Sequence, residues 1–111
     1  MKVSFEGIGE KLVTFIGKDV KTGDAVKVTD AGTVSACPEG EGFDGFVAGL
    51  SGEYAGVIIG GAVTVPYSGG APGFGSTELC ADGNGGVRSG KGVKCLVVDV
   101  DKTGETVTFI M

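Results

Sequence analysis

The sequence contains no histidine, no tryptophan and a single arginine among its 111 residues. Without histidine, a serine or cysteine nucleophile lacks its most common base, and a zinc ion lacks one of its usual ligands. No stretch approaches the ~18 consecutive apolar residues of a membrane-spanning helix, and the first residues lack the long apolar run of a signal peptide. We therefore expect no catalytic residues, no cofactor-binding residues, no metal site and no membrane partner.

Basic residues are also scarce, with 9 Lys and Arg against 14 Asp and Glu and a formal net charge of −5. They are scattered along the chain and never alternate with aromatic residues. A nucleic-acid-binding protein needs a basic surface that displaces counterions from phosphates. The charge pattern predicts that nucleic acid is not a partner.

The three cysteines, Cys37, Cys80 and Cys95, contain no C-x-x-C pair. Their number is odd, and free cysteine behaves as a small buried hydrophobe. We expect three reduced thiols in the core rather than a disulfide or a metal site.

What the chain has in excess is glycine, with 23 residues, alongside a hydrophobic fraction of 41%. A disordered linker would lack the valines and isoleucines to pack, and no amphipathic helical window is present. The pattern predicts an all-β fold: a small single-domain β-barrel or sandwich of short strands joined by glycine-rich turns. No period of 20 to 50 residues is apparent, which argues against a solenoid.

Alternation of apolar and polar residues predicts a β-rich domain over residues 11–111. Residues 1–10 are polar and dotted with glycine, and we expect them to form an N-terminal arm, mobile or ordered on a partner. The predicted strands are 11–17, 25–29, 33–36, 46–50, 54–59, 62–65, 77–81, 87–88, 94–100 and 106–110.

The stretch Tyr54 to Tyr67 places Gly60-Gly61 between two apolar, β-branched runs. Two glycines in this position favour a two-residue hairpin turn, because such turns require positive φ. We predict a hairpin here, in the middle of the core. Pro66 cannot donate to a strand ladder, so the second strand should end there or lie at an edge.

Four segments resemble chemical motifs but are better explained as turns or solvated strand. Residues 40–45 fit G-x-G-x-x-G, but a strand follows and acidic residues would repel phosphate. Residues 85–92 lack the hydroxyl that ends a phosphate-binding loop, and residues 82–93 lack the glycine and glutamate of a calcium loop. Asp99 and Asp101 share one face of a strand, which we expect to face solvent and protect a sheet edge.

Taken in order, several segments resemble tailed-bacteriophage capsid decoration (head-stabilising) proteins, over about residues 11–111. They are TGDAVKV at 22–28, GTV at 32–34, FDGFV at 43–47, VIIGGAVTVPY at 57–67, LCADGNGGV at 79–87, CLVVDV at 95–100 and TVTFI at 106–110. The three cysteines and the high glycine content depart from that family's pattern.

The resemblance implies a small β-rich structural virion protein on the outside of an icosahedral phage shell. Such a protein typically forms a trimer that clamps neighbouring major capsid subunits, and it resides in the bacterial host cytoplasm during assembly. Lambda-type members use an N-terminal arm for docking, which would here be residues 1–10. Because aromatic and apolar residues concentrate interface energy, the expected capsid or protomer contacts are Val3, Phe5, Ile8, Phe43, Tyr67 and Phe74.

Core burial is the competing interpretation of the aromatic residues, and for Phe46 it is the preferred one. Two other functions remain open. The chain could be a β-barrel binding module for a glycan or peptide, with Tyr54, Tyr67 and Phe74 lining a groove. It could also be a small histidine-free enzyme that uses Asp99, Asp101 or a thiol, in which case one of these groups should have a perturbed pKa in a cleft.

Overall fold

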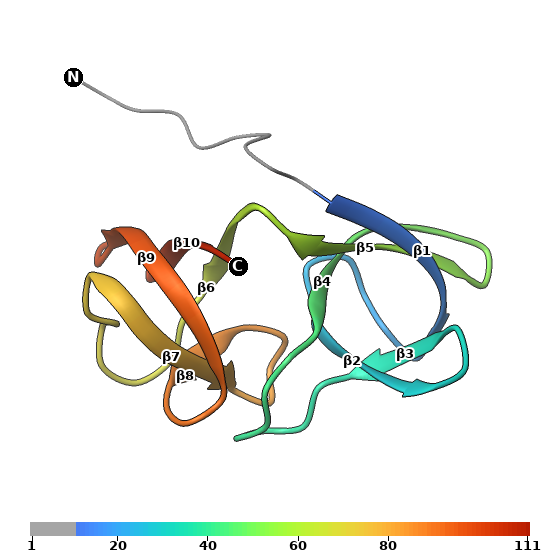
Figure 1. The fold of residues 1–111 in the computed structure, drawn as a ribbon, viewed down its shortest axis with the longest axis horizontal. Helices are drawn as coiled ribbons and strands as arrows, with labels where there is room; N and C mark the ends of the chain where they lie inside the picture. The colour runs from blue at the N-terminus through green and yellow to red at the C-terminus, as the bar shows by residue number, and fades with distance from the viewer. Residues whose placement is uncertain (1–10) are drawn as a thin grey trace.

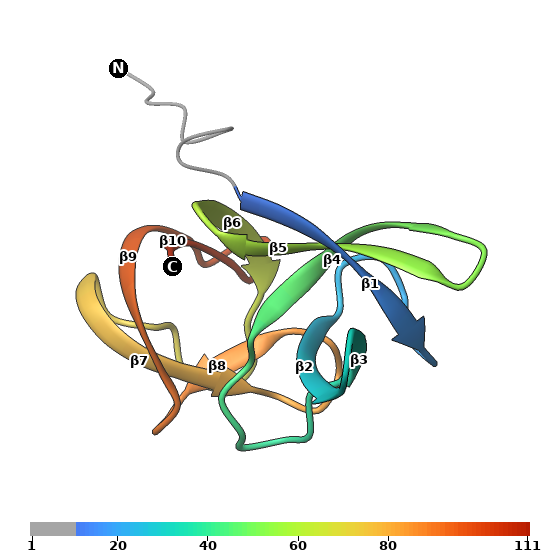
Figure 2. The same cartoon turned by 45° about the vertical axis from the view of Figure 1, so that its right-hand side comes forward.

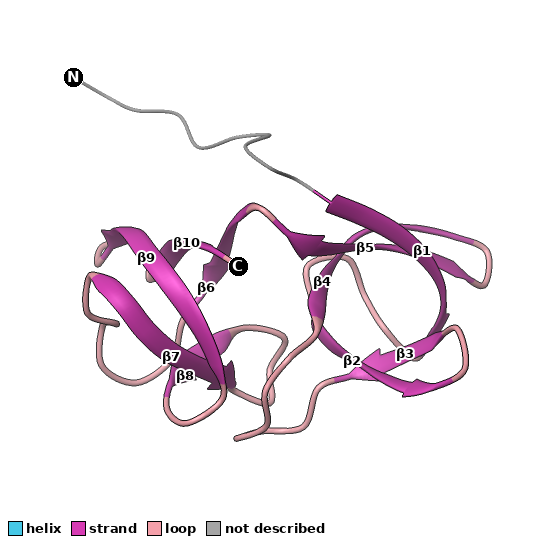
Figure 3. Cartoon of the chain, viewed as in Figure 1, coloured by secondary structure: helices cyan, strands magenta, loops and turns pink. Residues whose placement is uncertain are grey.

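The computed structural model describes residues 11–111, which form ten β-strands and no helix (Figures 1 and 3). This confirms the predicted all-β class and the existence of each predicted strand, with bounds shifted by a few residues at most. The strands are β1 (Lys11–Lys18), β2 (Ala25–Asp30), β3 (Thr33–Ala36), β4 (Gly45–Ser51), β5 (Tyr54–Gly60), β6 (Ala62–Pro66), β7 (Gly75–Ala81), β8 (Val87–Ser89), β9 (Val93–Asp101) and β10 (Thr106–Ile110).

The first five strands close into a barrel in the order β1-β3-β2-β4-β5, with β5 paired back to β1 (Figures 1 and 2). The β1–β3 pair is parallel and the other pairs are antiparallel. Because the sheet closes, no strand of this half has an unpaired edge along its whole length.

The last five strands form a second sheet in the order β6-β10-β9-β7-β8, in which all pairs are antiparallel. Its two edge strands meet at one point. Tyr67, directly after β6, forms a parallel bridge with Val87 of β8, and the Ser68 amide donates to the Val87 carbonyl oxygen at 2.9 Å. The second sheet is therefore almost closed.

Strand for strand, the second half (β6–β10) repeats the pairing of the first half (β1–β5). The pairs β1–β5, β5–β4, β4–β2 and β2–β3 correspond to β6–β10, β10–β9, β9–β7 and β7–β8, and the parallel β1–β3 pair corresponds to the bridge between Tyr67 and Val87. Both halves also have a β-bulge at the equivalent place. In the first half it lies between the Val47–Val57 and Gly49–Gly56 pairs. In the second half it lies between the Val97–Phe109 and Asp99–Thr108 pairs.

This repeat corrects the expectation that the chain has no internal periodicity, although the exclusion of a solenoid stands. Few identities accompany it, which explains why inspection of the sequence misses it. They include Gly40-Glu41-Gly42 against Gly90-Lys91-Gly92, Gly52-Glu53 against Gly104-Glu105, and Val13-Thr14 against Val63-Thr64. Most other positions keep only the pattern of burial, which many sequences satisfy.

The predicted hairpin about Gly60-Gly61 is wrong. β5 pairs with β1 and β4, whereas β6 pairs with β10, so the two strands belong to different sheets. Gly61 has φ 96°, and Gly60 is not among the residues with positive φ, whereas both hairpin turn types expected here require positive φ at the first position. Both edges of β5 are already occupied, so the glycine pair passes the chain from one half to the other.

The two halves share one large core. A small cluster of valines and alanine fills the barrel: Val26, Val34, Val47, Ala55 and Val57. The larger cluster lines the second sheet, and it includes Phe43 and Phe46 from the first half. These two rings pack on Phe109 of β10 at centroid distances of 6.0 and 5.8 Å. The second sheet is thus completed by aromatic side chains of the barrel half.

Other expectations hold. β6 ends at Pro66 and lies at the edge of the second sheet, as its missing N–H predicts. Cys37, Cys80 and Cys95 are buried free thiols. The β2–β3, β4–β5 and β9–β10 pairs form hairpins across the short gaps between consecutive predicted strands.

Candidate protein-interaction surface

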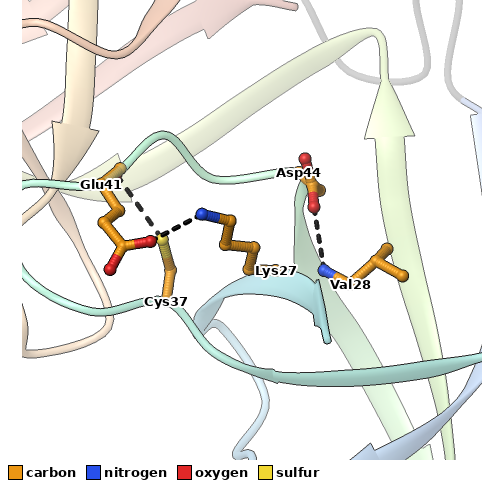
Figure 4. A network of polar contacts seen from close by, with 5 residues as sticks. All are labelled: Lys27, Val28, Cys37, Glu41 and Asp44. Carbon is orange, nitrogen blue, oxygen red and sulfur yellow. Dashed lines mark hydrogen bonds and ion pairs between the residues drawn. The ribbon is translucent and has the colours of Figure 1, made fainter. Parts of the chain in front are cut away.

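The loop of residues 37–44, between β3 and β4, carries Phe43 into the shared core and is held at several points (Figure 4). The Val28 amide donates to the Asp44 carboxylate at 2.8 Å, and the Cys37 thiol donates to the Glu41 carbonyl oxygen at 3.5 Å. The Lys27 ammonium pairs with the Glu41 carboxylate at 2.6 Å, which raises the pKa of Lys27 by hydrogen bonding and then by charge. Glu41 and Asp44 of the loop therefore attach it to Lys27 and Val28 of β2.

The same loop pairs with the second half. The Gly40 amide donates to the Ala81 carbonyl oxygen, and the Ala81 amide donates to the Glu41 carbonyl oxygen, both at 2.9 Å. The G-x-G-x-x-G resemblance therefore belongs to a loop whose amides bind backbone and not phosphate. It is less solvated than predicted, because Phe43 and Gly45 are buried.

Asp82 is the buried polar residue of the turn between β7 and β8, with 8% of its surface exposed. Its carboxylate accepts hydrogen bonds from the Asn84 and Gly86 amides at 2.7 and 3.0 Å and from the Ser68 hydroxyl at 2.7 Å. The segment that resembles a calcium loop is thus a turn closed by one carboxylate. Among residues 11–111, no group of three or more His, Cys, Asp or Glu side chains could hold a metal ion.

The expected contact residues fall into three groups. Val3, Phe5 and Ile8 lie outside the described residues. Phe43 and Tyr67 are 2% and 7% exposed, so they lie in the core and cannot touch a partner in the folded protein. Phe74, in the loop before β7, is 70% exposed. Of the described candidates, only Phe74 is available to a partner, because the first two are needed to fill the second sheet.

The groove of Tyr54, Tyr67 and Phe74 that a glycan-binding module would use is not formed as expected, because Tyr67 is buried. The groups considered for catalysis are arranged as follows. Asp99 and Asp101 are exposed on β9, as predicted. The expected protection of a sheet edge is wrong, because β9 is the central strand of the second sheet and pairs with β10 and β7. Burial raises the pKa of the Cys95 thiol to about 11, which keeps it protonated at neutral pH and makes it a poor nucleophile.

Several exposed apolar side chains lie together on the outer side of the barrel, where β1 runs beside β5. We define this β1–β5 face by Leu12, Thr14 and Ile16 of β1 and by Tyr54 and Gly56 of β5. Thr14 pairs with Gly56, and Ile16 pairs with Tyr54, so the side chains form two adjacent rows. Leu12, Ile16 and Tyr54 are 56%, 41% and 52% exposed, which is unusual for such large apolar side chains on a sheet.

Sequence reasoning did not identify this face. In the predicted strand 11–17, alternation sets Leu12, Thr14 and Ile16 on one side and Val13 and Phe15 on the other. Both sides are largely apolar, so alternation alone does not show which side faces solvent. The available signal was that both sides of the strand are apolar, which indicates a strand covered on both faces.

No protein-family model matches this chain, and no curated protein sequence does. Among residues 11–111, the structure contains no helix that is long and apolar enough to cross a membrane.

Proposed function

We propose that the chain is a structural assembly protein, a compact β module that binds other proteins and performs no chemistry. More specifically, we propose that it is a structural virion protein of the capsid-decoration class. In this role it binds the outside of a tailed-phage capsid as a homotrimer and stabilises the shell by clamping major capsid subunits.

The observation that carries this proposal is the exposure of large apolar side chains on a rigid, nearly closed double barrel. Phe74, Leu12 and Tyr54 are more than half exposed, in a chain whose core is otherwise well filled. Exposed aromatic and branched apolar side chains on a soluble β module are typical of protein interfaces. The absence of histidine, together with the raised pKa of Cys95, supports a binding role over a catalytic one.

A decoration role also suits the architecture. Many copies on one shell would each need only a modest affinity, because repeated contacts provide avidity. A module whose two halves share one core keeps its contact surfaces in a fixed relative position, which reduces the entropy lost on binding. We place the capsid contact at the loop that carries Phe74, at the far end of β7 from the turn that Asp82 closes.

Co-sedimentation tests the proposal. The purified protein is mixed with expanded heads of the phage that encodes it, prepared without their decoration protein. The protein that pellets with the heads is then quantified. Wild-type protein should saturate the heads, and Phe74→Ala should bind at least about tenfold more weakly, as expected for the loss of an interface anchor. Val28→Ala, which shortens an exposed side chain of the first half, is the control and should bind as wild type.

Wild-type protein that stays in the supernatant at all concentrations would refute the decoration role. Equal weakening by the two substitutions would instead show that the Phe74 loop is not the contact.

A further inference from the structure

The internal repeat provides a comparison within one chain for the β1–β5 face. The matching positions of the second half lie on β6 and β10, where Thr64 pairs with Thr108 and Pro66 with Thr106. Leu12 corresponds to Ala62, Thr14 to Thr64, Ile16 to Pro66, Tyr54 to Thr106, and Gly56 to Thr108. Apart from the threonine shared by positions 14 and 64, the first half has large apolar side chains and glycine at these positions, and the second half has alanine, proline and threonine.

The neighbouring strand shows the same contrast. Gly49 of β4 pairs with Gly56, and its counterpart Asp99 of β9 pairs with Thr108. A Cβ built on Gly49 would meet no atom within 4 Å, and one on Gly56 would meet nothing closer than 3.9 Å, so neither glycine is required by crowding. Neither has positive φ. The two glycines therefore place no side chain beside Leu12, whereas the second half carries the polar side chains of Thr108 and Asp99 at the matching positions.

We infer that the β1–β5 face is the surface through which copies of this chain associate, with the face turned toward the symmetry axis of the homo-oligomer. The trimeric stoichiometry rests on the proposed function. The β1–β5 face adds to that proposal the surface through which the three copies would associate. The corresponding face of the second half then points to solvent.

The absence of charge on this face favours a second copy of the same chain as its binding partner. Rotational symmetry brings residues near the axis against the same residues of neighbouring copies. A carboxylate there would meet other carboxylates, and copies of net charge −5 already repel one another. Neither the five residues of the β1–β5 face nor the adjoining Gly49 carries a charge, whereas Asp99 occupies the position that matches Gly49. The nearest charge in the β1 row is Lys18, at the end of the strand. The exposed Leu12 and Tyr54, next to glycines that carry no side chain, also allow the face to pack against a copy of itself.

The test uses a matched pair of substitutions, Thr14→Glu and Thr64→Glu. The two threonines are exposed and occupy equivalent positions in the two halves, where Thr14 pairs with Gly56 and Thr64 pairs with Thr108. The Thr64 hydroxyl also lies in hydrogen-bond contact with the Thr108 hydroxyl at 2.8 Å, so Thr64→Glu is the more disruptive change locally and a stringent control. Sedimentation velocity over a range of protein concentrations measures association. We expect wild-type protein and Thr64→Glu to form the same trimer, and Thr14→Glu to require at least about tenfold higher concentration for half-association, because it places like charges around the axis.

A second variant guards against a folding defect. Tyr54→Thr installs the residue found at the matching position, Thr106, adds no charge, and should also weaken association while its thermal transition remains cooperative. A monomeric wild-type protein, or equal effects of Thr14→Glu and Thr64→Glu, would overturn the inference. So would conversion of a monomer to an oligomer on deleting residues 1–10, because the occupant would then be the chain's own N-terminal segment.

The outcomes separate the two proposals. A trimer that depends on Thr14 but does not bind phage heads refutes decoration and leaves the self-association face established. A monomer that binds heads and loses binding with Thr14→Glu refutes self-association, and shows that this face contacts the capsid.

Discussion

The ring of Phe43, from the loop that precedes β4, lies 6.0 Å from the ring of Phe109 in β10. Phe46 completes the group at 4.8 Å from Phe43 and 5.8 Å from Phe109. Two aromatic side chains of the first half therefore occupy the interior of the second sheet. Because of this shared contact, we expect the two repeated halves to unfold as one cooperative unit.

Phe43→Ala should lower the free energy of unfolding by about 3–5 kcal/mol, because it removes a buried ring and leaves a cavity. Urea unfolding followed by far-UV circular dichroism and by tyrosine fluorescence measures this. The two tyrosines report on different halves, since Tyr54 begins β5 and Tyr67 follows β6. Coincident wild-type transitions are expected. Phe74→Ala, at an exposed position, should change stability by no more than about 0.5 kcal/mol.

Gly92→Ala and Gly42→Ala should differ although the two glycines occupy equivalent positions in the repeat. A Cβ on Gly92 would overlap the Leu79 carbonyl oxygen, whereas one on Gly42 would make an ordinary contact of 3.4 Å with the Val93 side chain. We expect Gly92→Ala to cost about 1–3 kcal/mol, as overpacking does, and Gly42→Ala to be nearly neutral. Thermal denaturation measures both, and equal midpoints would contradict the prediction.

Asp82→Ala should destabilise the protein by about 1–3 kcal/mol, because the buried Gly86 amide, the partly buried Asn84 amide and the Ser68 hydroxyl lose their acceptor. Asp101→Ala is the control. Its carboxylate accepts hydrogen bonds from the Thr103 and Gly104 amides, but the turn is exposed and water can replace it. If Asp101→Ala lowered the free energy of unfolding as much as Asp82→Ala, burial of Asp82 would not explain the destabilisation.

Cys95 should make stability depend on pH in the alkaline range. Burial raises its pKa from 9.0 to about 11, so the folded state retains the thiol proton more tightly than the unfolded state does. The contribution of the protonated Cys95 thiol to the free energy of unfolding is complete below about pH 9. It is lost as the pH rises from about 9 to 11, at no more than about 1.4 kcal/mol per pH unit.

The measurement is the difference in unfolding free energy between wild type and Cys95→Ala, taken at several pH values. This difference should be constant below about pH 9 and shrink above it. Cys37, whose pKa burial also raises, is present in both proteins and its contribution cancels. A difference that stays constant up to about pH 10.5 would show that the Cys95 thiol is not shielded.

Local sequence determined the strands and most of the turns, because alternation and glycine punctuation act over a few residues. It also determined that the cysteines are buried and that β6 ends at Pro66. These features depend on the backbone chemistry of each segment, which neighbouring residues suffice to specify.

Tertiary structure decided the strand pairs other than the three local hairpins β2–β3, β4–β5 and β9–β10. The Gly60-Gly61 turn was mispredicted because β5 finds β1 and β4, and a local pattern does not reveal partners that lie far along the chain. It also decided that Phe43 and Tyr67 are core while Leu12, Ile16 and Tyr54 are surface. All five are apolar residues in plausible strand or loop positions, and only the closing of the barrel and its packing on the second sheet determine which of them remain exposed to water.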